Sequence, residues 1–74
     1  MKLEIDLHGF TYDEAVLTVE NCLIEQSLNN EYLDVTIITG NSGKMQQIII
    51  DRVLNYHQFS HFIPAWNTGI IIIN

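Results

Sequence analysis

Hydrophobic and polar residues alternate strictly over residues 2–8, at the start of the chain. Apolar side chains occupy every second position there, from Leu3 to Leu7, and polar side chains occupy the positions between them. Because successive side chains of a strand point to opposite faces, this pattern predicts a half-buried β-strand. The polar face ends in Asp6 and His8, which we expect side by side at the last positions of the strand.

Two later stretches carry core-facing residues at helical spacing. The first follows Thr11 and Glu14, which fit a capping box, in which each side chain bonds the backbone amide of the other residue. This helix is expected to end at Asn29-Asn30. Ser42 is the expected N-cap of the second helix. The predicted stripes are Ala15, Val16, Val19, Cys22 and Leu23 in the first helix, and Met45, Ile48, Ile49, Arg52, Val53 and Tyr56 in the second.

Three further stretches predict strands. Residues 34–39 are β-branched on both faces, which indicates a central strand. Residues 59–66 contain Pro64, whose missing N–H places that strand at an edge of the sheet. A hairpin turn at residues 67–69 then leads into the all-apolar strand 70–73, which belongs in the middle of the sheet.

The predicted order β-α-β-α-β-β indicates an α/β two-layer sandwich. Right-handed crossovers place both helices on one face of a four-stranded mixed sheet. With the proline-containing strand outside and the isoleucine strand inside, we expect the spatial order 1-2-4-3, with the fourth strand antiparallel. The ends of the first three strands then meet at one rim, which collects Asp6, His8 and Gly9 with residues 39–43 and the turn at 66–69.

Composition narrows the class of protein. The 74 residues suffice for one domain, residues 1–74, with a marginal core, and a hydrophobic content of 47% argues against disorder. Nine acidic against three basic residues give a formal net charge of −6, which disfavours tight binding to a bare nucleic-acid backbone. The longest apolar run, residues 70–73, is too short to cross a bilayer, and no signal-peptide pattern is present. We therefore expect a soluble cytoplasmic protein with no membrane partner.

Residues 5–15, IDLHGFTYDEA, resemble the first motif of the Smr (small MutS-related) domain family, (L/I)DLHG-x4-EA. The later TGNSG, residues 39–43, is similar to the family's TGxG or HGxG loop, with Asn41 where members usually carry a basic residue and Lys44 close by. The resemblance covers nearly the whole chain and implies a fold like the C-terminal domain of translation initiation factor three. It also implies endonuclease activity, with the DLHG segment tied to cleavage and the glycine loop to nucleic-acid contact.

Asp6 and His8 are the candidate catalytic residues. An imidazole accepts and releases protons near neutral pH, so His8 could take the proton of a ribose 2′-hydroxyl. Asp6 would orient the imidazole or stabilise its charged form. Internal attack by the 2′-hydroxyl needs no metal, so we expect no cofactor. The alternative is that the pair only holds the Gly9 turn through hydrogen bonds to backbone amides.

A glycine-containing loop supplies the candidate phosphate-binding residues. Small side chains let the chain approach a ligand closely, and backbone amides at the start of the second helix favour an anion. An ordinary turn capped by Ser42 explains the same pattern. The candidates are Gly9, Thr39, Gly40, Asn41, Ser42, Gly43 and Lys44.

Trp66 and Asn67 are candidates for contact with a nucleic-acid base, by stacking and by hydrogen bonding. Core or edge packing is the more common role of a tryptophan on a small sheet, and we favour it for Trp66. His57 and His61 are separated by a helix end and lack the spacing of a helical metal pair, so we expect solvated or hydrogen-bonded histidines and no metal site.

These features together predict an Smr-like endonuclease domain whose partner is nucleic acid, RNA rather than DNA, with the ribosome as a further partner. A non-catalytic module of the same fold, which binds RNA, the ribosome or a protein, is the alternative. The net charge of −6 and the asparagine at position 41 favour that alternative. An inactive remnant, whose rim only stabilises the fold, is the third interpretation.

Overall fold

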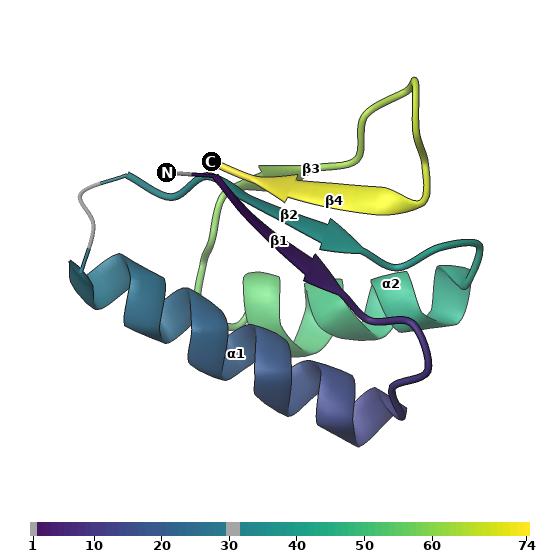
Figure 1. Cartoon of the computed structure of the whole chain (residues 1–74), viewed down its shortest axis with the longest axis horizontal. Coiled ribbons are helices and arrows are strands. Elements are labelled where there is room, and N and C mark those ends of the chain that lie inside the picture. The colour runs from purple at the N-terminus through teal and green to yellow at the C-terminus, as the bar shows by residue number, and fades with distance from the viewer. Residues whose placement is uncertain (1, 30–31) are drawn as a thin grey trace.

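In the part of the chain that the structure describes, four strands form one mixed sheet, and both helices cover one of its faces, as the sequence predicts (Figure 1). The computed structural model describes residues 2–29 and 32–74, so Asn30, the second residue of the predicted helix end, lies outside the described residues. The elements in chain order are β1 (Leu3–Asp6), α1 (Tyr12–Asn29), β2 (Val35–Ile38), α2 (Gly43–Ile49), the π-helical turn η1 (Ile50–Leu54), β3 (His61–Phe62) and β4 (Ile70–Ile73).

The strand order β1-β2-β4-β3 confirms the predicted topology. β1 pairs with β2 in parallel, and β4 is antiparallel to both of its neighbours. Parallel pairing brings the ends of β1 and β2 to the same edge of the sheet, with Asp6 opposite Ile38. The register therefore places the polar end of β1 directly beside the residues that follow β2.

The helix-covered face of the sheet forms the apolar core. Alternation along each strand directs one set of side chains to this face and the other set to the open face. Burial of apolar area supplies most of the favourable free energy of folding, so a domain this small must use every core position. The core residues are Ile5, Leu7, Val35, Ile37, Ile71 and Ile73 of the sheet side, Ala15, Val19 and Leu23 of α1, and Met45, Ile49, Val53 and Leu54 of α2 and η1.

The predicted stripe of the second helix rests on regular α-helical spacing, but the helix ends in a wider turn. Residues Ile50–Leu54 form a π-helical turn, whose hydrogen bonds span one residue more than those of an α-helix. The wider turn shifts the following side chains around the helix axis. Leu54 therefore joins the core, and Tyr56 is exposed. The predicted stripe is wrong at Tyr56 and also at Arg52, which lies at the surface.

The edge strand is shorter than predicted. β3 contains only His61 and Phe62, instead of residues 59–66. Pro64 has no N–H to donate to a neighbouring strand and is buried, so the chain leaves the sheet near this residue. The predicted short hairpin turn is therefore wrong: residues 63–69 form a longer connection, which rises on the side of the sheet away from the helices (Figure 1).

The start of α1 is held by the capping box that the sequence predicts. The Thr11 amide donates to Oε1 of Glu14 at 2.9 Å, and the Glu14 amide donates to Oγ1 of Thr11 at 3.2 Å. The hydrogen bonds from the backbone and the side chain of Thr11 hold the pKa of the Glu14 carboxyl below its ordinary value.

We expect acid to weaken the parent protein more than the variant Glu14→Gln. A carboxylate whose pKa falls on folding stabilises the fold above its ordinary pKa, and this contribution is lost as the pH falls through the folded pKa. Glutamine keeps an acceptor oxygen but cannot titrate. Urea unfolding between about pH 7 and about pH 3 measures how much of its free energy of unfolding each protein loses in acid. Identical pH profiles for the two proteins would show that the Glu14 charge does not contribute.

Candidate functional site

A sharp turn after β1 sets the direction of His8. The Phe10 amide donates to the Leu7 carbonyl at 3.1 Å, and Gly9, inside the turn, has a φ of 79°. This left-handed conformation favours glycine, since a Cβ would be strained there. Oδ1 of Asp6 accepts a hydrogen bond from the His8 backbone amide at 3.0 Å. The DLHG segment therefore makes a turn that its own aspartate stabilises.

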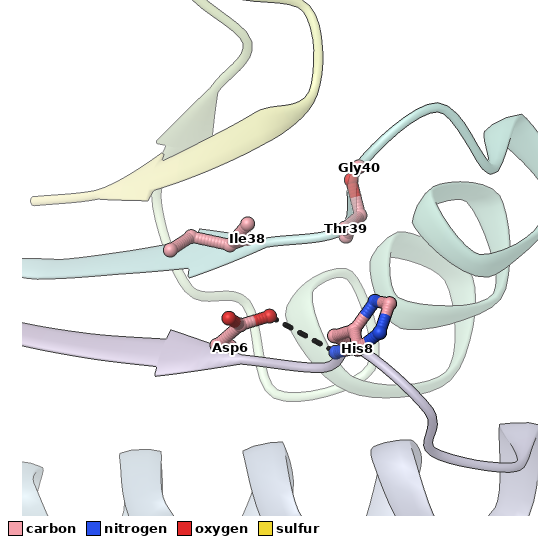
Figure 2. Close-up of a pocket in the computed structure, with 5 residues that line it drawn as sticks. All are labelled: Asp6, His8, Ile38, Thr39 and Gly40. Atoms are coloured by element: carbon pink, nitrogen blue, oxygen red, sulfur yellow. Dashed lines mark hydrogen bonds between the residues drawn. The ribbon is translucent and has the colours of Figure 1, made fainter.

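Asp6 and His8 line a pocket of about 290 Å³ together with Ile38, Thr39 and Gly40. Figure 2 shows both side chains extending from the end of β1 towards the segment that continues β2. The parallel register explains this arrangement, because it puts the ends of the two strands side by side. Asp6, His8 and Gly40 therefore converge at one rim of the sheet, as the sequence predicts.

The Asp6 carboxylate bonds to the backbone and not to the imidazole. Its Oδ1 holds the His8 amide, and the described part of the chain provides no hydrogen-bond partner for its Oδ2 or for either ring nitrogen of His8. Both residues are exposed to solvent. One carboxylate oxygen thus has the turn-holding role that is the alternative interpretation of this pair. The second oxygen and the imidazole are open to a ligand in the pocket.

The chain after β2 is tied to the turn before β4. The amides of Thr39 and Gly40 both donate to the Gly69 carbonyl, at 2.9 and 3.0 Å, and Oγ1 of Thr39 donates to the same oxygen at 3.1 Å. Gly69 lies so close that an added Cβ would be 3.1 Å from the Gly40 carbonyl oxygen. These contacts fix the loop in place. They also engage the Thr39 and Gly40 amides, so these two groups are not available to a phosphate.

Gln46 also connects the chain after β2 to the turn before β4, and nothing in its sequence context predicts this role. Its Nε2 donates to the Thr68 carbonyl at 2.9 Å and to Oγ1 of Thr39 at 3.2 Å. A glutamine inside a helix carries no local signal for such contacts. Only the pairing of β2 with β4 brings Thr68 within reach of this side chain.

The rest of the loop lines a second pocket, of about 250 Å³. Asn41, Ser42 and Gly43 contribute to it, and the structure, over the residues that it describes, gives their backbone amides no acceptor. Oγ of Ser42 accepts from the Met45 amide at 3.1 Å, which confirms the predicted N-cap. Gly40 lines this pocket and the Asp6–His8 pocket, so the two are adjacent. Consecutive free amides of this kind can donate to the oxygens of an anion.

Two of the candidate phosphate ligands lie outside both pockets. Gly9 shapes its turn and lines neither of them. Nζ of Lys44 lies 5.3 Å from the centroid of the Tyr12 ring, a cation–π geometry, and is also absent from both linings. Nη1 of Arg52 lies 3.7 Å from Oδ1 of Asp13. These two cationic side chains are therefore directed towards the start of α1.

Trp66 and Asn67 lie over the open face of the sheet and not in the Asp6–His8 pocket. Trp66 is 76% exposed, so the packing role favoured for it from the sequence is wrong. Both residues line a third pocket, of about 320 Å³, with residues of β1, β2 and β4. Residues 63–69 rise away from the helices instead of making a tight hairpin (Figure 1), and of the predicted turn at 66–69 it is Gly69 whose carbonyl accepts from the rim amides of Thr39 and Gly40.

The two remaining histidines are hydrogen-bonded. Nε2 of His57 lies 2.7 Å from Oε2 of Glu20, and Nδ1 of His61 lies 2.8 Å from the Phe59 carbonyl oxygen. Among residues 2–29 and 32–74, no group of three or more His, Cys, Asp or Glu side chains is placed to hold a metal ion. None of the described helices is long and apolar enough to cross a membrane.

Comparison with known proteins identifies one family. The family model described as Smr domain matches residues 5–69, nearly the whole chain. The matched span contains every residue that lines the Asp6–His8 pocket and the second pocket, and it contains Thr36, Ile38, Trp66 and Asn67 of the third. A comparison with curated proteins gives no match, and a comparison with solved structures gives none either.

Proposed function

The chain belongs to the Smr domain family, which is linked to nuclease and nucleic-acid-binding roles, and on that premise we propose that it is an endonuclease that cleaves RNA at the Asp6–His8 pocket. One observation carries the proposal. The imidazole of His8 has no hydrogen-bond partner among the described side chains and backbone groups, and it shares a pocket with the Asp6 carboxylate. Such an imidazole can act as a general base or a general acid.

In the proposed reaction, the His8 imidazole takes the proton of a ribose 2′-hydroxyl. The 2′ oxygen attacks the adjacent phosphorus, so that the O2′–P bond forms and the P–O5′ bond breaks. The departing 5′ oxygen takes a proton from the imidazolium or from water. Asp6 stabilises the imidazolium with its charge and holds the His8 backbone with Oδ1. The products are a 2′,3′-cyclic phosphate and a 5′-hydroxyl.

The loop after β2 has a binding role in this proposal. The free amides of Asn41, Ser42 and Gly43 donate to the oxygens of a phosphate next to the one that reacts. The adjacency of the two pockets through Gly40 supports this arrangement, as do the small side chains, which let the backbone approach the ligand.

A cleavage assay on RNA and DNA of one sequence tests the proposed activity. We expect the parent protein to cut RNA in the presence of EDTA, because attack by the 2′-hydroxyl does not require a metal. Mass spectrometry should identify the cyclic phosphate, and 2′-O-methyl RNA, whose 2′ oxygen is blocked, should remain intact. Cleavage of DNA or of the 2′-O-methyl RNA at a comparable rate would contradict the proposed mechanism.

A non-catalytic module that binds RNA, the ribosome or a protein is the second candidate function. The charge favours it, since the chain has nine acidic and three basic residues, and Lys44 and Arg52 contact α1. Asn41, where family members usually carry a basic residue, favours it as well. Saturable binding by the folded parent protein, without cleavage of any of the substrates above, would make this the better assignment.

A further inference from the structure

The open face of the sheet carries a groove with no role in the reaction proposed above. Its volume of about 320 Å³ lies in the range of small-ligand pockets. The floor consists of sheet side chains that point away from the helices, and Trp66 and Asn67 of the connection to β4 stand beside it. The lining residues are Lys2, Glu4, Thr36, Ile38, Trp66, Asn67, Ile70 and Ile72.

Three features of this groove match the chemistry of an unpaired nucleotide. Trp66 is 76% exposed, and an indole accepts any base by stacking. Oδ1 of Asn67 accepts from the Gly69 amide at 3.0 Å, so the NH₂ half of its amide is the half open to a base edge. Lys2 has no ion pair within the described residues and can contact a phosphate.

Glu4 lines the same groove and offsets the charge of Lys2. The groove therefore has no net formal charge. Stacking and contact with the apolar floor, rather than attraction to phosphate, must supply most of the affinity for any nucleotide bound there. This is consistent with a domain whose net charge of −6 repels a bare polynucleotide backbone.

The groove adjoins the Asp6–His8 pocket. Ile38 lines both of them. Asp6 is paired with Ile38, and Ile38 is paired with Ile70, so the path from the pocket to the groove crosses two strand spacings, roughly 10 Å. A polynucleotide that enters the pocket thus needs only a short step to place a neighbouring base on Trp66.

We propose that this groove binds one unpaired base of the substrate RNA beside the cleaved bond, by stacking the base on Trp66. A base inside a duplex is stacked on its neighbours and presents no free face, so the groove selects single-stranded RNA and loops. The cleavage part of this proposal rests on the proposed function, whereas the binding part does not.

Fluorescence of Trp66 tests the binding part directly, because it is the one tryptophan in the sequence. A single-stranded 2′-O-methyl oligonucleotide, which cannot be cleaved through its 2′ oxygen, should quench the fluorescence saturably, and a blunt duplex of the same sequence should not. No quenching by the single strand, or equal quenching by the duplex, would overturn the proposal. Quenching by a basic apolar peptide, without quenching by the oligonucleotide, would assign the groove to protein docking and would also overturn it.

Substitution of the aromatic ring gives a second readout, with anisotropy of a labelled oligonucleotide in place of tryptophan fluorescence. Trp66→Leu should weaken binding of the single strand about 5- to 150-fold, and Trp66→Phe should restore most of it. Tyr56→Leu is the matched control, since Tyr56 is also 76% exposed but does not line the groove. Equal losses of oligonucleotide affinity in Trp66→Leu and Tyr56→Leu would overturn the assignment of the groove to base binding.

Cleavage assays separate failure of the groove from failure of the proposed function. If single-stranded RNA quenches Trp66 but is never cut, the groove stands and the endonuclease assignment fails. If Trp66→Leu cuts single-stranded RNA with the KM of the parent protein, while His8→Ala does not cut it, the endonuclease assignment stands and the groove proposal is overturned. The expected result is an increase in KM for single-stranded RNA in Trp66→Leu.

Discussion

His8→Ala is expected to slow RNA cleavage by about 10²–10⁴-fold while the protein keeps the fold of its parent, because positioned acid–base groups contribute rate enhancements of this size. The imidazole is exposed and has no hydrogen-bond partner in the described structure, so its removal leaves no cavity and breaks no hydrogen bond. The His8 backbone amide, which donates to Asp6, remains in the variant. Initial rates give kcat/KM, and thermal unfolding gives the Tm. A folded His8→Ala variant that cuts at the parental rate would show that His8 is not the base.

Asp6→Asn and Asp6→Ala form a matched pair that separates the two roles of the aspartate. Asparagine keeps an oxygen that can accept the His8 amide, so the turn survives and only the charge is removed. Alanine removes both the charge and the acceptor. If the charge supports the imidazolium, both variants lose activity and only the alanine variant also loses stability. If Asp6 only holds the turn, the asparagine variant is as active as the parent.

The Asp6–His8 pocket could be predicted because its parts are local or follow from general topology. Strict alternation places the two side chains on one face of a strand, and the helical crossover between the first two strands makes them parallel, so their ends meet. In the structure, this parallel pairing has Asp6 opposite Ile38. Gly9 by itself predicts the turn after the first strand, since a turn with positive φ favours glycine.

The groove beside Trp66 could not be predicted in the same way. Pro64 marks an edge strand, but it does not determine where that strand ends or to which side the chain then turns. The observed connection, residues 63–69, depends on tertiary contacts such as the bonds from Thr39 and Gly40 to the Gly69 carbonyl. The π-helical turn Ile50–Leu54 was not predicted either, because the predicted stripe assumes a regular α-helix to its end.

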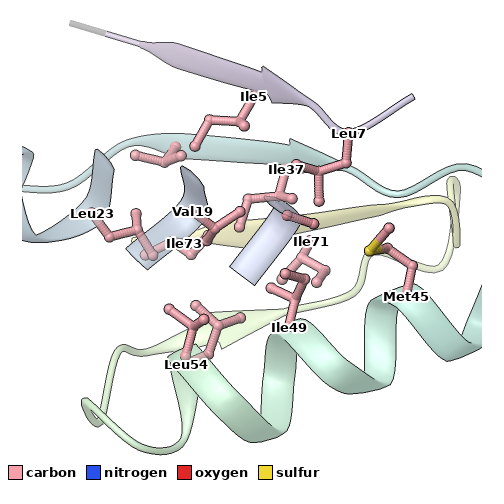
Figure 3. Close-up of a cluster of buried hydrophobic side chains, with 13 residues drawn as sticks. Ile5, Leu7, Val19, Leu23, Ile37, Met45, Ile49, Leu54, Ile71 and Ile73 are labelled. Atoms are coloured by element: carbon pink, nitrogen blue, oxygen red, sulfur yellow. The ribbon is translucent and has the colours of Figure 1, made fainter. Parts of the chain in front are cut away.

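Ile71→Ala is expected to remove much of the free energy of unfolding, whereas Ile72→Ala, one position along the same strand, is not. Ile71 is 0% exposed, and Figure 3 shows it pointing from β4 towards Ile49 of α2. Truncating a buried isoleucine to alanine costs about 2–5 kcal/mol, through lost burial and the cavity that remains. A domain of this length has a free energy of unfolding of roughly 4–11 kcal/mol, so the variant should be close to unfolding.

Ile72 faces the opposite side of the sheet, where no helix covers it and where it lines the groove beside Trp66. Its truncation opens no cavity in the core, because the side chain is only half-buried. The free energy of unfolding should therefore fall far less than in Ile71→Ala, and the loss should appear instead in affinity for single-stranded RNA. Urea unfolding and oligonucleotide binding, measured on both variants, compare the two faces of one strand with one kind of side chain. Equal destabilisation by the two substitutions would mean that the open face is packed as tightly as the core, which would contradict both the two-layer architecture and a groove free to bind a base.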